Sequence, residues 1–191
     1  YVFNSTAPAA SGGFVYITGG SLTLTTGTRI EYSASGVDGG AVHMSGGVLT
    51  ISNGSALVHS SAGSRYDAVF LSQGGAMFIQ GGIVDIDKSL IAYSLSAGKY
   101  GGAFALFGGS LTVTGSTIRN ASATLVALVV IFSGKASFSS THVEHLRGLF
   151  GCDVDAGCEL HFVRSVIDLR VPYDNRTRTM TVSADEDAET V

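Results

Sequence analysis

The chain has little of what several classes of protein depend on. Its 191 residues include no tryptophan and only two prolines, and charged residues make up 14% of the sequence. No stretch keeps a helical apolar period of about 3.6 residues between two capping signals, which argues against a helical bundle. The longest apolar run, Leu125 to Phe132, is too short to cross a bilayer, so we expect no membrane span.

The small and unevenly placed charge limits the partners of the chain. The net charge is −4, and four acidic residues fall in the last nine positions. The other 11 acidic residues equal the 11 lysines and arginines in number, so no basic surface for a nucleic acid is expected. A body of balanced charge has little self-repulsion and associates readily. We expect Tyr1 to be a processed end, because no initiator methionine and no signal sequence precede it.

Glycine is plentiful, with 26 residues, and its arrangement reveals a repeat. Gly-Gly pairs begin at positions 12, 39, 74 and 101, and a second pair follows each of them seven residues later. The spacings of 27, 35 and 27 residues place an insertion at roughly Ser60 to Gln73. The aligned copies read FVYITGGSLTLTTGTRIEY, AVHMSGGVLTISNGSALVH, AMFIQGGIVDIDKSLIAY and AFALFGGSLTVTGSTIRN, followed by the degenerate copies VVIFSGKASFSSTHVEH and DVDAGCELHFVRSVIDL.

Each copy contains three short runs in which apolar residues alternate, a pattern typical of β-strands. In the third run one apolar residue recurs in every copy, two positions after a serine or threonine. Residues two apart on a strand point to the same side, so we expect both to face the core and the hydroxyls to hydrogen-bond from coil to coil. The apolar residues are Ile30, Leu57, Ile91, Ile118, Val143 and Ile167, and the hydroxyl residues are Thr28, Ser55, Ser89, Ser116, Thr141 and Ser165.

These patterns predict an all-β chain folded as a parallel β-helix, a solenoid of about six coils with three strands each. The β-helix is expected over residues 12–169, with the glycine pairs at its corners. Residues 1–11 are expected to form an extended N-terminal arm, and residues 170–191 a C-terminal arm that ends in the acidic tail.

The starts GGAV, GGAM and GGAF at positions 39, 74 and 101 are each followed by a segment of the type GG-x-L-x-I. These segments resemble the right-handed parallel β-helix repeats of secreted surface proteins. The best-known bearers of GGA[ILV] repeats are the polymorphic outer-membrane proteins of chlamydiae. The resemblance covers roughly residues 12–169, and it implies a right-handed solenoid that lies outside the cell.

All four asparagines of the chain begin an acceptor pattern for an N-linked sugar, N-x-[ST] without proline. Serine and threonine make up about a fifth of the residues, so four chance matches would occur on the order of once in several hundred such chains. The pattern therefore predicts a glycosylated protein of a eukaryotic secretory pathway, with coincidence as the alternative. The predicted acceptors are Asn4, Asn53, Asn120 and Asn175.

The chain has two cysteines, Cys152 and Cys158. In a secreted chain such an even pair predicts a disulfide, which would close a small loop in the last coil. Two cysteines without a matching pair of cysteines or histidines do not make a zinc site, and we predict neither a metal nor a cofactor.

Parallel β-helices often degrade polysaccharides, a reaction that requires catalytic acids. Asp85 and Asp87 alternate with apolar residues, which places them side by side on an outer face, about 7 Å apart. The aligned coils offer only hydroxyls beside them, so a solvated face is the simpler interpretation and no catalytic residue is predicted. His142 and His145 are expected on opposite faces of their strand, which argues against a shared metal ion.

The first strand of each coil is apolar at nearly every position, so apolar side chains are left on its outer side. Such a face marks an interaction site, unless the chain ends or the insertion cover it. We expect a structural subunit of an extracellular glycosylated filament, appendage or cell-surface coat, which self-associates head to tail or laterally. The alternatives are a polysaccharide-binding or polysaccharide-cleaving β-helix and a monomeric surface adhesin. The predicted interface residues are Phe14, Tyr16, Phe78, Phe107, Val130 and Phe132.

Overall fold

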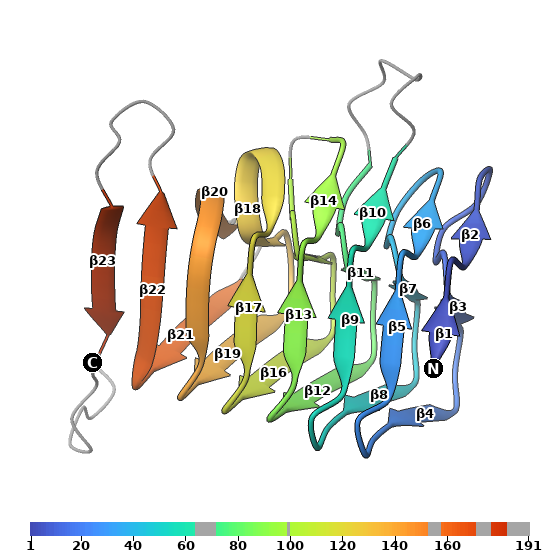
Figure 1. Ribbon diagram of the computed structural model, residues 1–191, viewed down its shortest axis with the longest axis horizontal. Helices are drawn as coiled ribbons and strands as arrows, with labels where there is room; N and C mark the ends of the chain where they lie inside the picture. Colours follow the sequence, from blue (N-terminus) through green and yellow to red (C-terminus); the bar gives the residue numbers. More distant parts are fainter. Residues whose placement is uncertain (64–71, 99, 153–157, 171–176, 183–191) are drawn as a thin grey trace.

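The computed structural model describes residues 1–63, 72–98, 100–152, 158–170 and 177–182. These residues form β-strands joined by turns, and Figure 1 shows the strands side by side along one axis. The described part of the chain contains no helix, and thus none with the length and hydropathy needed to cross a membrane. The predicted all-β class is confirmed.

The strands form four columns, in each of which successive coils pair in parallel. The first column contains β3 (Val15–Ile17), β7 (Val42–Met44), β11 (Met77–Ile79), β15 (Phe104–Leu106) and the second half of β18 (Ser122–Ile131). The second contains β4 (Ser21–Leu24), β8 (Val48–Ile51), β12 (Ile83–Asp87), β16 (Ser110–Thr114), β19 (Lys135–Ser139) and β21 (Glu159–Val163). The third contains β1 (Val2–Phe3), β5 (Arg29–Glu31), β9 (Ala56–Val58), β13 (Leu90–Ala92), β17 (Thr117–Arg119), β20 (His142–Cys152) and β22 (Ser165–Arg170). The fourth contains β2 (Thr6–Ala7), β6 (Ala34–Ser35), β10 (Ser61–Ala62), β14 (Leu95–Ser96) and the start of β18.

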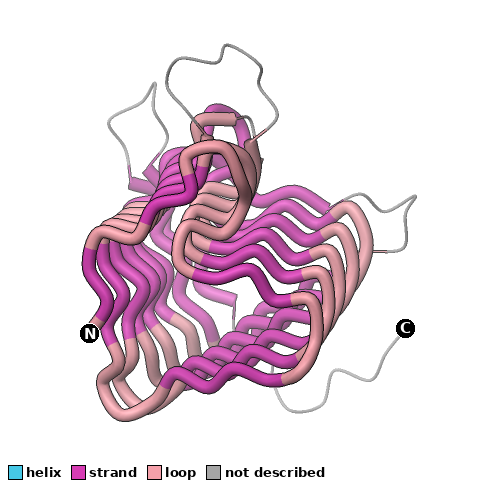
Figure 2. Tube along the Cα trace, turned by 90° about the vertical axis from the view of Figure 1, so that its right-hand side faces the viewer, coloured by secondary structure: helices cyan, strands magenta, loops and turns pink. Residues whose placement is uncertain are grey.

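The predicted stacking of equivalent residues is confirmed. In the third column Ile91 pairs in register with Ile118, and Ile118 pairs with Val143. All six apolar residues of this file have no exposed surface. Figure 2, which looks along the stack, shows the coils lying over one another, and the chain forms a parallel β-solenoid of about five turns.

The prediction of three strands per coil was incomplete. The fourth column is made of strands only two residues long, such as β6 and β14. A two-residue strand is too short to leave an alternating pattern in the sequence, so its signal is lost. The column nevertheless recurs in every coil from β2 to β18, which makes it part of the repeat.

The predicted file of inward hydroxyls is confirmed, and its bonds run both within and between coils. Each of the six hydroxyls donates to a carbonyl two or three residues earlier, at 2.7–3.1 Å. Between coils, the amide of Ser89 donates to Ser116 Oγ at 3.1 Å, and the amide of Thr141 donates to Ser165 Oγ at 3.2 Å. These bonds satisfy hydroxyls that are otherwise shut off from water.

A second file of buried hydroxyls lies at the entrance to the fourth column and was not predicted. Ser33, Ser60 and Ser94 are each 1% exposed, and their Oγ atoms have no hydrogen-bond partner in the described part of the chain. The next coil places Ala121 at the same point, where it belongs to the apolar core. The recurring pair of a ring residue and a serine, as in Tyr32-Ser33 and Tyr93-Ser94, was the signal for this file in the sequence.

The glycine pairs lie at corners, as predicted, and the two members of a pair have different roles. Gly39 has a φ of +63°, which a residue with a side chain rarely adopts. A Cβ on the next residue, Gly40, would lie 2.1 Å from the carbonyl oxygen of Gly75 in the following coil. In the pair that opens each copy, the first glycine thus supplies the turn and the second allows two coils to approach, whereas in the pair seven residues later the positive φ falls on the second glycine, as at Gly47.

The ends of the chain also pair with the sheet. Within the segment predicted as an arm, β1 and β2 pair in parallel with β5 and β6. At the other end β23 (Thr177–Val182) pairs with β22 in the antiparallel sense. The predicted insertion overlaps β10, which belongs to the repeat, and residues 64–71 within it lie outside the described part of the chain.

Candidate functional site

The outer side of the first column carries a continuous row of rings across five coils. The centroids of Tyr16 and His43 lie 4.3 Å apart, and those of His43 and Phe78 lie 5.0 Å apart. The row continues from Phe78 to Phe107 at 5.1 Å, and from Phe107 to Phe132 at 4.4 Å. We refer to these five residues as the first-column ring row.

The row stays continuous because, in a coil that has a small side chain at the expected position, the ring comes from a residue two positions later. Phe78 pairs in register with Ala105, which cannot continue a ring stack. The next outward residue of that coil is Phe107, and its ring covers the gap. This substitution explains why a residue-by-residue alignment of the repeat does not reveal the row.

Most of the first-column ring row is covered by the chain itself. His43 and Phe78 are 5% and 4% exposed, whereas Tyr16 and Phe107 are 51% and 40% exposed. Phe78 forms a small apolar cluster outside the core, to which Tyr100 contributes. Tyr100 belongs to a segment that leads back to the glycine corners, and it bridges in parallel to Gln73 and Val126.

The predicted interface residues therefore separate into three groups. Phe78 and Val130 are buried within the chain, and Phe132 is half-buried beside them. Phe14 is half-buried against the core at the N-terminal end of the solenoid. Tyr16 and Phe107 remain exposed, and they are the part of the set that a partner can reach.

His43 lies in the middle of this row in an environment that disfavours its charge. Its ring is sandwiched between Tyr16 and Phe78, and Nε2 lies 3.4 Å from Oε1 of Gln80. Burial lowers the pKa of His43 from its ordinary value, and the Gln80 contact offsets part of this effect. The neutral imidazole is therefore the form that the fold favours.

A second row of rings, which sequence reasoning missed, lies at the corner between the third and fourth columns. Tyr32, His59 and Tyr93 each follow a strand of the third column, and all three are exposed. Their centroids are 4.6 Å and 4.7 Å apart, with nearly parallel planes. Each lies two residues after the recurring apolar residue of its copy, Ile30, Leu57 or Ile91, and this position was visible in the sequence.

Three of the four predicted sugar acceptors lie at turns of the solenoid. Asn4, Asn53 and Asn120 have φ values of +57°, +53° and +54°, a conformation that asparagine tolerates better than most residues. Asn4 and Asn53 are exposed, and Asn120 is half-buried. Asn175 lies outside the described residues.

The repeat supplies a structural cause for one acceptor pattern. Asn53 turns the corner, and Ser55 two residues later is fully buried in the file of inward hydroxyls. The N-x-S spacing at this point follows from the corner and the file together. Glycosylation of the four asparagines stays a prediction, and so does the disulfide, because the side chain of Cys152 lies outside the described part of the chain.

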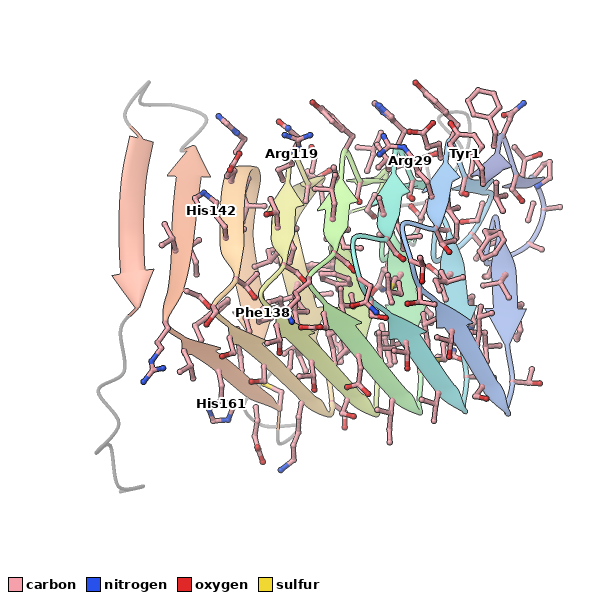
Figure 3. The ribbon with its side chains drawn as sticks, turned by 60° about the horizontal axis from the view of Figure 1, so that its bottom comes forward. Tyr1, Arg29, Arg119, Phe138, His142 and His161 are labelled. Atoms are coloured by element: carbon pink, nitrogen blue, oxygen red, sulfur yellow. The ribbon has the colours of Figure 1, made fainter. Side chains whose placement is uncertain are left out.

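The acid pair lies where the sequence placed it, on the outer side of the second column. Asp85 pairs in register with Thr50 and Thr112, and Asp87 pairs with Thr114. Lys88 Nζ lies 4.0 Å from the carboxylate of Asp87. The neighbouring coils thus present hydroxyls to these acids, on a face from which His161 also points outward (Figure 3).

The prediction that His142 and His145 point to opposite sides is wrong. His145 has a φ of +53°, so the chain turns at this residue and the alternation of the strand ends. Both imidazoles lie near the carboxylate of Glu144, with Nε2 of His142 at 3.1 Å and Nδ1 of His145 at 3.7 Å. Among the described residues no group of three or more His, Cys, Asp or Glu side chains is arranged to hold a metal ion.

Comparison with known proteins adds no relative to these observations. No protein-family model matches the chain, and neither a curated protein nor a solved structure matches it at a significant level. The class that the fold itself defines is a parallel β-solenoid.

Proposed function

We propose that the chain is a structural subunit of an extracellular, glycosylated filament, appendage or cell-surface coat. The supporting observation is the pair of open ends of the second column. β4 and β21 are the outermost strands of this six-stranded sheet, and each pairs on one side only within the described residues. An edge strand with free amides and carbonyls is a template for another chain.

The core side chains at the two ends agree with such a contact. Leu22 of β4 and Leu160 of β21 face inward but remain partly exposed, in contrast to their fully buried equivalents in the middle coils. A second copy placed head to tail would pair β21 with β4 and cover both. In the third column β23 already pairs with β22 in the antiparallel sense, whereas the second column is open at both of its described ends.

The exposed rings and corners account for the remaining parts of the proposal. Tyr16 and Phe107 offer apolar area for lateral contact. Glycans at Asn4 and Asn53 would project from exposed turns. The resemblance to the GGA repeats of secreted surface proteins supports a place outside the cell.

The oligomeric state tests the proposal through one matched pair of variants. Thr23 and Thr112 occupy the same outward file of the second column and are both exposed, but Thr23 lies on the edge strand β4 and Thr112 on the inner strand β16. Lysine on an edge strand blocks pairing with another strand. We expect Thr23→Lys to convert assemblies into monomers in sedimentation velocity, and Thr112→Lys to leave them intact.

Two outcomes would contradict the head-to-tail contact. If the wild-type chain sediments as a monomer at all concentrations, no filament forms and a monomeric adhesin becomes the better hypothesis. If Thr23→Lys and Thr112→Lys assemble equally well, the contact lies elsewhere. A polysaccharide-binding solenoid is the second candidate, and the second row of rings favours it because aromatic side chains line many ligand sites.

A further inference from the structure

One residue from each of six successive coils stands at the corner between the third and fourth columns. The φ values of all six fall between +53° and +57°, so the six side chains leave the backbone in the same way. We call this set the corner file, and it consists of Asn4, Tyr32, His59, Tyr93, Asn120 and His145. The amides of the first five donate to the coil that follows, as Tyr93 does to the carbonyl of Arg119 and Asn120 to that of Glu144, at 3.0 Å and 3.1 Å.

Where the corner file carries rings, it forms a regular stack. Tyr32 and His59 are inclined by only 3°, and His59 and Tyr93 by 11°. Their centroid distances of 4.6 Å and 4.7 Å equal the spacing of the strands beneath them, about 4.8 Å. The sheet thus sets the period of the stack.

The stack is interrupted at a single coil of the C-terminal half. Asn120, a short amide, occupies the corner between Tyr93 and His145, and these two rings are therefore two strand spacings apart, about 9–10 Å. A cavity of about 180 Å³ lies at this corner, lined by Asn120, Ala121, Ser122 and His145. A ring placed there would lie about one strand spacing from the imidazole of His145.

Arg119 and Glu144 are charged residues that come directly before the lining residues Asn120 and His145. The guanidinium of Arg119 lies over the ring of Tyr93, 5.8 Å from its centroid, and Figure 3 shows Arg119 at this corner. Glu144 lies near Nδ1 of His145 and thereby orients the imidazole. One positive and one negative residue thus adjoin the lining residues in the sequence, which favours a ligand without net charge.

We propose that this corner binds one pyranose ring of a neutral sugar, stacked on the imidazole of His145. The volume is below the roughly 300–1,000 Å³ of pockets for drug-sized ligands, which suits a single ring. The Asn120 amide and the Ser122 hydroxyl offer both donors and acceptors, as sugar hydroxyls require. The apolar C–H face of the sugar would contact the face of His145.

The sugar can come from either of two sources. Asn120, Ala121 and Ser122 form the acceptor pattern N-A-S, so the ring could be the first sugar of a glycan attached to Asn120 itself. It could also be a residue of a separate glycan that binds from solution. Both sources place the same chemistry on His145, and neither depends on assembly into a filament.

The binding experiment uses unglycosylated protein made in bacteria and methyl N-acetyl-β-glucosaminide as the probe. The chain has five histidines, so the imidazole signals can be followed individually by NMR after ¹⁵N labelling. We expect the His145 signal to shift in a saturable manner, with a Kd of about 1 mM, since one ring makes few contacts. Adenosine serves as the competing planar ligand, and a saturable shift with adenosine in place of the sugar would overturn the proposal.

Two substitutions at the same kind of corner provide the matched control. Asparagine tolerates positive φ, so His145→Asn and His59→Asn remove a ring without straining the backbone. We expect His145→Asn to weaken binding of the probe at least about tenfold, and His59→Asn to change it less than about twofold. Equal effects of the two variants would overturn the proposal.

The second arm uses protein secreted by a eukaryotic host. A glycan found by mass spectrometry on the peptide with Asn120, together with a shifted His145 signal and no response to the probe, would identify the attached sugar as the ligand. A glycan at Asn120 with an unshifted His145 signal would overturn the proposal. So would a peptide without a glycan when the bacterial protein also fails to bind the probe.

Discussion

Two files of buried hydroxyls run along the same solenoid, and the contrast between them shows what each position selects. In the file at the start of the third column, every hydroxyl donates to a carbonyl, and some also accept an amide from a neighbouring coil. In the file at the start of the fourth column, the hydroxyls of Ser33, Ser60 and Ser94 have no partner in the described part of the chain. Apart from Thr28 in the first coil, which is half-buried, both files are almost fully shielded from solvent.

The difference lies in the backbone around each file. The first file follows a corner whose carbonyls and amides point toward the side chains, so a hydroxyl replaces hydrogen bonds that the turn leaves open. The second file lies beside backbone groups that already pair between coils, as when the amide of Leu95 donates to the carbonyl of Ser60 at 2.9 Å. There the chain needs a small side chain, and Ala121 serves equally well.

The largest effect is expected from enlarging a residue of the second file. Ser94→Leu adds two heavy atoms at a position that is 1% exposed. We expect it to lower the free energy of unfolding by about 3 kcal/mol, because an overfilled core forces neighbouring side chains out of their rotamers. Urea unfolding followed by circular dichroism measures this, and a loss below about 1 kcal/mol would show that the site is not closely filled.

A smaller loss is expected from removing a hydroxyl of the first file. Ser116 Oγ donates to the carbonyl of Thr114 at 2.8 Å and accepts the amide of Ser89 at 3.1 Å. Ser116→Ala leaves this buried amide without a partner, so we expect a loss of about 1–2 kcal/mol in the same assay.

Ser94→Ala is the matched control for this change, because it removes a buried hydroxyl that has no partner. We expect the free energy of unfolding to stay within about 0.5 kcal/mol of wild type, or to rise slightly. If Ser94→Ala were as costly as Ser116→Ala, the two files would not differ in the way described.

The smallest effect on stability is expected at His43, another buried polar residue that lacks a full set of hydrogen-bond partners. Its Nδ1 has no hydrogen-bond partner in the described residues, and burial holds the pKa of His43 below its ordinary value of 6.5. As the pH falls, His43 therefore takes up a proton in the unfolded chain at a higher pH than in the folded chain. Its contribution to the free energy of unfolding is complete above about pH 6.5 and is lost below it. We expect the free energy of unfolding to fall less steeply between pH 7 and pH 5 in His43→Phe than in wild type.

The urea midpoint at several pH values measures this difference. Tyr16, Phe78 and Gln80 surround His43 and carry no charge at these pH values. The substitution thus changes one titrating group. If the urea midpoints of wild type and His43→Phe change with pH in parallel, His43 does not contribute to the pH dependence of stability.

The sequence predicted those parts of the molecule that repeat with a short period. The file of Ile91, Ile118 and Val143, the hydroxyl two residues before each, and the glycine corners were all predicted and found. These positions could be read because the fold repeats the same environment in every coil, so each copy carries the same constraint. The fourth column escaped prediction because two residues cannot show a period.

The candidate sites depend on information that no single repeat contains. Phe107 continues a row that Phe78 begins only because Ala105 leaves space, and the segment around Tyr100 then covers that row. His145 joins His142 near Glu144 because its backbone turns at positive φ. Such relations arise between coils or at corners, where alternation along a strand no longer decides the direction of a side chain.

The sequence by itself determined the all-β class, the order of the coils and the residues that fill the core, because each inward position must be apolar or hydrogen-bonded wherever it recurs. Only the tertiary structure decided which outer rings remain exposed and which corner holds a cavity. Exposure depends on which segment of another coil crosses a given side chain, and that contact is formed by residues distant in the sequence.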